Sequence, residues 1–389
     1  MIKPHYRVFA CFFLFAFALG AMLGRLPDIQ TKLGLTEGQL GLTLIGMATG
    51  SLLALTLGSQ WIERMGAKVT AFVTVLGTAF CYALIPWLPN AYLVFATLFV
   101  AGILAGLLEI NLNLEADRIE AHLNKRVMNR AHGMWSLGFF VTALLAAGVR
   151  QAGIPVTVHT GVAFAIVLVA SLVLLPGMTN APHRADSKPH EEGEHRIALP
   201  NLGLLPLCII GIAAFLVEGT GVDWSVIYMR DSFEIAPFIA GLSLTMFTGL
   251  MAVGRLFADP VVERFGPRAV ATSMLALAAL GSLLIGIAPH PYVALAGFGM
   301  IGLGSSCVYP LAVSAAAQRT DRPSAVNVAA LAQVSFVVFF AGPPLLGFVA
   351  EHFGIRVSYL VVLPVILAGF VLTGSLEPKR KAEAVAADA

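Results

Sequence analysis

Residues 63–66 read ERMG, and residues 263–266 read ERFG, 200 positions later. The same offset relates four further sets of residues: Pro89 and Pro289, Tyr92 and Tyr292, Gly102 and Gly302, and Phe139-Phe140 and Phe339-Phe340. Apolar matches arise easily by chance in a chain rich in apolar residues, whereas charged, proline and tyrosine matches do not. A fixed period indicates that one structural unit is used more than once. We therefore expect two halves that share one fold.

The composition indicates that these halves lie in a membrane. Hydrophobic residues make up 58% of the chain, charged residues 12%, and the mean hydropathy is +0.85. A soluble domain is about 45–50% apolar and about 25% charged. The net charge of +2 provides no basic field for nucleic acid, so we expect no nucleic-acid partner. The four cysteines have no CxxC spacing, which predicts packing residues rather than disulfides or metal ligands.

The apolar segments predict a polytopic all-α protein. A membrane-spanning helix needs about 20 mostly apolar residues. Twelve segments qualify, near 6–25, 38–61, 69–88, 91–116, 131–150, 155–176, 204–229, 236–256, 269–288, 291–317, 324–350 and 357–376. Because each half contains six, an even number, both halves begin on the same side of the membrane, which is a parallel repeat.

The domain boundaries follow from the longest break between spans. Residues 177–203 are rich in charge, His and Pro, and we interpret them as a solvated linker on the cytoplasmic side. Their histidines are irregularly spaced, so we expect no metal site. The expected domains are a six-helix bundle over residues 1–176 and a second over residues 204–389 that ends in a short cytoplasmic tail.

The distribution of Lys and Arg predicts the orientation. If the chain begins in the cytoplasm, 19 of its 24 Lys and Arg residues fall on the cytoplasmic side. The exceptions are Arg25, Lys32, Arg150, Arg230 and Arg356. We therefore expect both termini to be cytoplasmic.

The fourth span contains a carboxyl group near its middle. Successive helical residues are rotated by about 100°, so Gly102, Gly106, Glu109, Asn113 and Glu120 share one face. A carboxylate inside a bilayer costs at least roughly 2.5–3.5 kcal/mol and should face the bundle interior or a wet cavity. We hypothesise that Glu109 couples protons or binds substrate, with Asn113 beside it. The alternative is a structural Glu that is hydrogen-bonded to a neighbouring helix.

The seventh span offers a partner for this carboxyl group. Glu218 lies near its middle, and Asp223 and Trp224 lie closer to the outer end. We place Glu218 with the proton-coupling and substrate residues, and Asp223 in the substrate cavity. Trp224 has two interpretations of equal weight, because Trp contacts ligand rings and is also common at membrane interfaces.

Other candidates for the cavity come from the fifth span and from the repeat. His132 and Ser136 are four residues apart on one helix face with Trp135 beside them, although packing or capping explains them equally well. Tyr309 is the repeat counterpart of Glu109, and Gln333 is the counterpart of Gly133.

A charged pair flanks Pro27 at the outer end of the first span. Arg25 and Asp28 are either a gate pair or an interfacial pair.

The repeated charges lie in two cytoplasmic turns, residues 58–68 and 254–268. A latch between the halves would use Glu63, Arg64, Glu263 and Arg264, together with Arg255 and Asp259, which are four residues apart and able to pair on a helix. Plain anchoring by positive charge is the alternative reading.

These stretches resemble the major facilitator superfamily. GSQWIERMGAK (58–68) is similar to its loop 2–3 signature, with Glu63 in place of an Asp and Ala67 in place of a basic residue. GRLFADPVVERFG (254–266) resembles the second-half form of this motif in the YbjJ-like inner-membrane proteins, relatives of the fucose–proton symporters. Three further stretches resemble the same branch: LLEINLNLEADRIE (107–120), EGTGVDWS (218–225) and FFAGPPLLGF (339–348).

The resemblance implies a proton-coupled sugar site and a bacterial inner membrane. In fucose symporters a helix 4 Glu, followed four residues later by an Asn, takes part in proton-coupled sugar binding, and Glu109 and Asn113 match that pair. Those symporters also use an acidic residue within helix 1. This chain has none before Asp28, at the end of that span, so Glu218 is the candidate substitute.

The expected function is secondary transport of a small polar solute, such as a sugar or sugar derivative, by alternating access of the two halves. Protons are the expected coupling ion, with no other cofactor, and a monomer in the lipid bilayer is the expected form. The chain carries no HExxH, GxSxG or Walker A sequence, so we expect no enzyme. The alternatives are an exporter or antiporter of a small amphipathic compound and a non-transporting membrane sensor.

Overall fold

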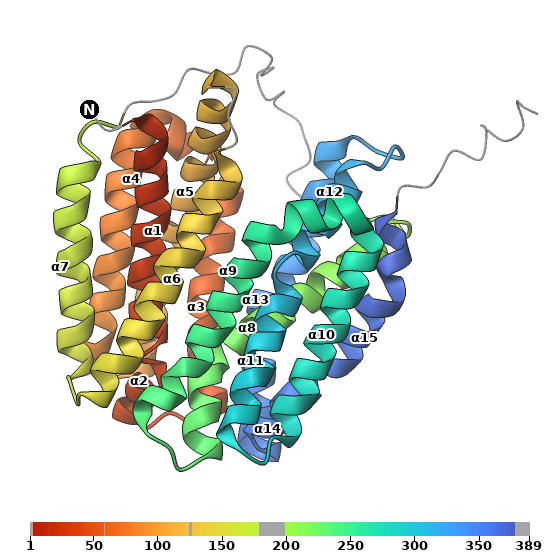
Figure 1. Ribbon diagram of the computed structural model, residues 1–389. Coiled ribbons are helices and arrows are strands. Elements are labelled where there is room, and N and C mark those ends of the chain that lie inside the picture. Colours follow the sequence, from red (N-terminus) through yellow and green to blue (C-terminus); the bar gives the residue numbers. More distant parts are fainter. Residues whose placement is uncertain (1–2, 58, 124–126, 179–198, 378–389) are drawn as a thin grey trace, which may run out of the picture.

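The structure is a computed structural model that describes residues 3–57, 59–123, 127–178 and 199–377 (Figure 1). Every secondary-structure element among these residues is a helix. The first group is α1 (Pro4–Leu23), α2 (Leu26–Leu33), α3 (Glu37–Leu57), α4 (Ser59–Leu84), η1 (Ile85–Trp87), α5 (Ala91–Leu123), α6 (Met128–Gln151) and α7 (Val156–Leu174). The second group is α8 (Leu205–Ser232), α9 (Pro237–Phe265), α10 (Pro267–Ile287), α11 (Pro291–Ser305), α12 (Val308–Ala317), α13 (Ser324–Phe353), α14 (Ile355–Leu360), α15 (Leu363–Val371) and η2 (Leu372–Leu376).

The predicted all-α fold with twelve membrane spans is confirmed. Among the described residues, eleven helical segments are long and apolar enough to cross a membrane, and α3 occupies the remaining predicted span. The tenth predicted span is two helices, α11 and α12, and the last divides into α14, α15 and η2. The first span ends at Leu23, and the short helix α2 follows with Pro27 in its first turn, where the missing N–H of proline costs nothing.

The repeat seen in the sequence is also a repeat in three dimensions. Gly66 has φ 74° and ψ 159°, and Gly266 has φ 81° and ψ 156°. This region of backbone space is open almost only to glycine, which explains why both ERxG copies end in that residue.

The helix packing repeats in the same way. A side chain added to Gly102 on α5 would collide with the carbonyl oxygen of Met47 on α3, and one added to Gly302 on α11 would collide with that of Phe247 on α9. Both the glycines and their neighbours are thus related by the offset of 200.

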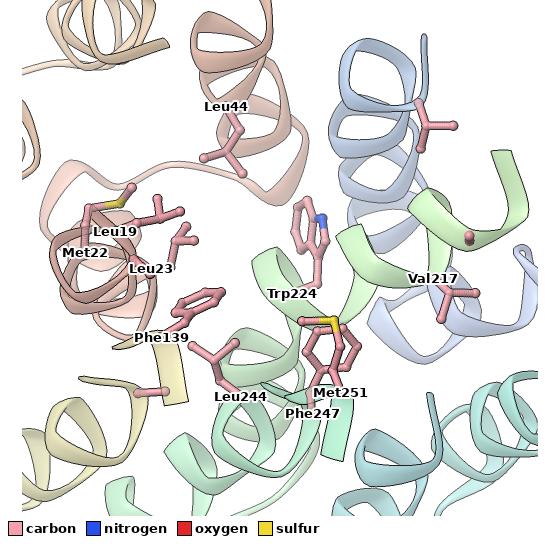
Figure 2. Close-up of a cluster of buried hydrophobic side chains, with 14 of the residues drawn as sticks. Leu19, Met22, Leu23, Leu44, Phe139, Val217, Trp224, Leu244, Phe247 and Met251 are labelled. Atoms are coloured by element: carbon pink, nitrogen blue, oxygen red, sulfur yellow. The ribbon is translucent and has the colours of Figure 1, made fainter. Parts of the chain in front are cut away.

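The two groups meet along α6 and α9, along α3 and α13, and where α2 touches α8. A central apolar cluster lies at this meeting, with Leu19, Met22, Leu23, Leu44 and Phe139 from the first group and Val217, Trp224, Leu244, Phe247 and Met251 from the second (Figure 2). Its side chains are almost fully buried, so the contact resembles the core of a protein.

We name the ends of the molecule by the chain. The proximal end is where α1 begins and α7 ends, and the distal end is where α1 ends and α2 lies, toward the bottom of Figure 1. The predicted linker lies mostly outside the described residues, as do eight residues of the Lys and Arg pattern: Lys125, Arg126, Arg184, Lys188, Arg196, Lys379, Arg380 and Lys381.

Candidate functional site

Arg230, in the last turn of α8, connects the two groups at the distal end. Its guanidinium donates to the carbonyl oxygen of Pro27 at 3.2 Å, to Oγ1 of Thr31 at 3.3 Å and to Oε1 of Gln30 at 2.9 Å, all on α2. It also pairs with Asp231 at 2.5 Å, which leaves the cation neutralised. One side chain thus fixes α2 against the second group.

Two further hydrogen bonds close the same end. The amide N–H of Gly38 donates to Oε2 of Glu351 at 3.0 Å, and the amide N–H of Phe238 donates to Oε1 of Gln151 at 3.2 Å. The backbones of α3 and α13 also lie so close that a side chain at Gly41 would collide with the carbonyl oxygen of Pro343. The distal end is therefore shut by direct contact between the groups.

Arg25 and Asp28, expected as a gate pair or an interfacial pair, do pair with each other, and the pair has a third member. Asp28 accepts from Arg25 and, through Oδ1, from Nε of Arg150 on α6 at 3.0 Å. Arg25 also donates from Nη2 to the carbonyl oxygen of Ile154 at 2.8 Å. Arg25 is only 4% exposed, so this is a largely buried network within the first group rather than an interfacial pair. It positions α2, which in turn receives Arg230.

The proximal end differs: where both partners are described residues, every hydrogen bond between the two groups lies at the distal end. Of the predicted latch residues, Arg64, Glu263 and Arg264 are exposed, and Arg264 lies over the ring of Phe265 at 5.2 Å. The side chain of Glu63 lies outside the described residues.

Arg255 corrects one part of the predicted latch. Among the described residues it pairs with Glu218 on α8, at 3.3 Å between Nη2 and Oε2, and not with Asp259 one turn away on α9. Its Nε donates to the carbonyl oxygen of Ser306 at 3.3 Å. Arg255 extends toward α8, where it reaches the carboxylate of Glu218. A carboxylate in an apolar setting attracts a cation more strongly than the exposed carboxylate of Asp259 does.

Glu109 combines two features that rarely occur together. It lies in the interior of the 33-residue helix α5 with protein atoms packed around it, yet its side chain is exposed. It interacts electrostatically with Tyr309 on α12, in the other group. Within the described part of the chain it makes no hydrogen bond or ion pair. From this exposure and the interaction with Tyr309 we infer an open space between the groups in front of Glu109, and no hydrogen bond to a neighbouring helix is described for it.

The other polar residues of this stretch are structural or only partly buried. Asn111 donates from Nδ2 to the carbonyl oxygen of Ala67 at 3.1 Å, and Glu115 pairs with Arg118 at 3.1 Å. Asn113 is half-buried, and its Oδ1 is buried with no hydrogen-bond partner among the described residues. An unpaired acceptor one turn from Glu109 is a second feature available to a ligand.

Tyr309, which interacts electrostatically with Glu109, belongs to a cluster of aromatic side chains in the second group. The Tyr309 ring lies 4.2 Å from that of Phe215 on α8, measured between centroids. The Phe215 ring contacts those of Phe339 at 5.0 Å and Phe336 at 5.7 Å, both on α13. We call these four residues the aromatic wall. Tyr309 thus connects the Glu109 carboxyl group to a cluster of rings in the other group.

The candidates of the fifth span separate into two kinds. His132 is exposed and interacts electrostatically with Arg255 across the groups, and its ring lies 5.0 Å from that of Phe12. Trp135 packs on Phe139 at 5.4 Å. Ser136 is 1% exposed and donates to the carbonyl oxygen of His132, so it does not line the open space. His132 is thus accessible, whereas Ser136, one helical turn later, is buried in the protein interior.

The candidates of the second group also separate. Trp224 is 1% exposed and lies in the central apolar cluster (Figure 2), so it is neither at a membrane interface nor in the open space. Asp223 is half-buried and interacts electrostatically with Glu218. Gln333 is half-buried on α13. The structure therefore places the candidate residues in two sets. One set is Glu109 and Tyr309, and the other is His132, Glu218, Asp223 and Arg255.

Sequence reasoning did not identify the roles of Gln30, Arg150, Arg230 and the three phenylalanines of the aromatic wall. A signal existed for the basic residues. All five exceptions to the positive-inside pattern make hydrogen bonds at the distal end, and Lys32 and Arg356 donate to the carbonyl oxygens of Pro86 and Ala288. Phe215 and Phe336 carried no signal, because the chain has 25 phenylalanines, and Phe339 was noted only as the repeat counterpart of Phe139.

Relatives of this chain agree with this architecture. A family model described as the Major Facilitator Superfamily matches residues 8–220 and again residues 206–388. The uncharacterised transporter y4wD of Sinorhizobium fredii is 29% identical over 365 residues, which are 93% of this chain and 95% of the relative. The membrane protein MosC of Rhizobium meliloti is 26% identical over 357 residues, 91% of this chain and 85% of the relative.

Solved structures share the fold at low sequence identity. A variant of the nucleoside transporter NupG matches with a TM-score of 0.74 and 13% identity, over 96% of this chain and 100% of that one. A D-xylose–proton symporter matches with a TM-score of 0.74 and 15% identity, over 97% and 98%. The fucose–proton symporter FucP of E. coli matches with a TM-score of 0.62 and 18% identity, over 97% and 99%. With the family model matching both halves, the chain belongs to the Major Facilitator Superfamily and is an integral membrane transporter.

Proposed function

We propose that this protein is a proton-coupled secondary transporter of a small polar solute, such as a sugar or sugar derivative. The observation that carries the proposal is Glu109, an exposed carboxyl group in the interior of a membrane helix, with no ion pair or hydrogen bond among the described residues. An ionisable residue at such a depth is costly and marks a substrate or proton pathway. Two structural neighbours, a fucose–proton symporter and a D-xylose–proton symporter, support the choice of solute and ion.

The two halves, residues 1–176 and 204–389, act as the moving units in this proposal. The distal contacts support a state closed at that end, and the Lys and Arg pattern supports a cytoplasmic position for the proximal end. The family resemblance supports a bacterial inner membrane. This state opens toward the cytoplasm. Transport requires the contacts of Arg230 to break while the proximal ends approach. One chain supplies both halves, so the working unit is a monomer, and protons are the only coupling ion required.

The experiment is proton movement in proteoliposomes that contain a pH-sensitive dye, driven by a gradient of each sugar in a panel. The wild type is expected to move protons with solute, and Glu109→Gln is expected to lose this movement because the amide cannot exchange a proton. Glu115→Gln is the matched control, since Glu115 is on the same helix and pairs with Arg118. Unchanged proton movement per solute in Glu109→Gln would refute the proposal.

A further inference from the structure

We propose that the transported solute carries an ammonium group, which is held between the Glu109 carboxylate and the aromatic wall. This inference rests on the proposed function and names the chemical class of its solute. Two independent features support it: the balance of charge around the open space and the ring faces opposite Glu109.

The charge balance favours a cation. Arg255 lies beside Glu218 at 3.3 Å, so its charge is already matched within the second group. Asp223 adds a further carboxyl group near Glu218. His132 is the one other basic side chain that the described contacts place here, through its interaction with Arg255. Glu218 and Asp223 therefore lie near one arginine and one histidine, and Glu109, the third carboxyl group, has no counter-charge in the described structure.

A solute without charge would leave this imbalance in place. An anionic solute would add a like charge close to Glu109, which is unfavourable in a medium of low dielectric. An ammonium group would pair with Glu109 and is the ligand charge that completes the site. An ammonium group would not have to displace an internal partner of Glu109, because Glu109 has no such partner among the described residues.

The aromatic wall supplies the second half of an ammonium site. A cation within about 6 Å of a ring centroid is attracted to the ring face by roughly 0.5–2 kcal/mol, and aromatic cages bind ammonium ligands in this way. Tyr309 is half-buried, so its ring is partly accessible from the open space, and Phe215 supports it at 4.2 Å. Tyr309 is also the wall residue that interacts with Glu109. A cation between them would contact both.

Access to this position is from the proximal end. The distal route is closed by the hydrogen bonds of Arg230 and by the central apolar cluster, in which Trp224 is 1% exposed. Two hollows elsewhere in the described structure do not reach Glu109. One is lined only by residues between Met22 and Leu98 of the first group, and the other lies at the surface beside Phe265 and Glu377.

The experiment compares matched pairs of ligands on purified full-length protein. Glucosamine is compared with glucose, and tyramine with 4-ethylphenol, by isothermal titration and thermal shift at neutral pH. We expect the ammonium member of at least one pair to bind about tenfold or more tightly than its neutral partner, the change that an ion pair with a cation–π contact provides.

Three variants test the residues. Glu109→Gln is expected to remove the preference for the ammonium member. Tyr309→Leu should weaken that member and affect its neutral partner less, whereas Tyr309→Phe keeps the ring and should keep the preference. Glu115→Gln is expected to bind as the wild type does. Equal binding of both members of each pair, including no binding of either, would overturn the inference, as would a preference that persists in Glu109→Gln.

The same ligands in the proton-movement assay separate this inference from the proposed function. If ammonium ligands bind preferentially through Glu109 but move no protons, the inference stands and proton coupling fails. If neutral sugars bind as well as their ammonium partners and drive proton movement that needs Glu109, proton coupling stands and the ammonium site is refuted.

Discussion

The two ends of the interface between the helix groups are built differently. At the distal end, Arg230, Glu351 and Gln151 bond to backbone groups or amide side chains of the opposite group. At the proximal end, the exposed charges of Arg64, Glu263 and Arg264 lie at helix ends without a described bond between the groups. Bonds to backbone atoms hold one arrangement in place, whereas solvated charges are free to find partners in another. The comparison indicates that the distal contacts between the groups have to break during transport and that proximal contacts have to form.

The largest expected effect is on the network that positions α2. Asp28→Asn removes the carboxylate shared by Arg25 and Arg150, and Arg25 is 4% exposed with Nη1 already lacking a partner among the described residues. Breaking a buried ion pair leaves an uncompensated charge, so we expect a loss of about 2–4 kcal/mol of stability.

Thermal unfolding in detergent measures this loss. Asp231→Asn is the control, because Asp231 is exposed and pairs only with its neighbour Arg230 in the described structure. If Asp28→Asn unfolds at the wild-type temperature, the network does not position α2.

The next effect is on the distal closure itself. Arg230→Ala removes three hydrogen bonds between the groups and is expected to favour opening by about 1–2 kcal/mol, discounted because Arg230 is partly exposed. That change corresponds to roughly tenfold in the open population.

The measurement is the labelling rate of a cysteine at Leu44, in the central apolar cluster, by a membrane-impermeant thiol reagent. The native cysteines Cys11, Cys81, Cys208 and Cys307 are all buried. Labelling is expected to accelerate in Arg230→Ala but not in Arg356→Ala, because Arg356 donates to Ala288 within the second group. Equal acceleration in both variants would mean that the hydrogen bonds of Arg230 do not hold the distal end closed.

The smallest effect concerns a proximal contact within the second group. Asp321, after α12, accepts from Arg319, from Asn201 at 2.6 Å and from Asn327 at 3.2 Å. The Arg319 guanidinium holds the pKa of the Asp321 carboxyl well below its usual range near 3.8. A lowered folded-state pKa contributes stability at pH values above 3.8, and this stability is lost as pH falls below that value toward the folded pKa.

The melting temperature of Asp321→Asn should therefore lie slightly below that of the wild type at neutral pH. The difference should shrink as pH falls below 3.8. The labelling rate at Leu44 should not change, because the contact lies within one group. A difference that grows on acidification would contradict the assignment.

Much of the fold could be predicted because apolar length and glycine sterics are local. The spans follow from about 20 apolar residues each, and the repeat predicted the shared conformation at Gly66 and Gly266. The helix α2 was not predicted because it is short and partly polar and lies between two predicted spans. The break between α11 and α12 was not predicted because it does not interrupt the apolar pattern. Pro27, which lies in the first turn of α2, was noted in the sequence only because Arg25 and Asp28 flank it.

The site could be predicted only in part. The cost of burying a charge identified Glu109 from sequence alone, because it depends on one residue and its depth. Partners across the interface depend on helix rotation and on the state of the transporter, so the pairing of Arg255 with Glu218 could not be foreseen. Trp224 and Ser136 were misplaced because a helical wheel gives a direction but not the neighbour that lies in it.

Gly66 and Gly266 also bear on the handedness of the chain. Their backbone lies close to the mirror image of ordinary extended structure, which every chiral L-residue resists. Both halves have an achiral residue at this position. Every other encoded amino acid has a stereocentre at Cα, so the two sites exclude the same set of replacements, whatever the size or polarity of the side chain.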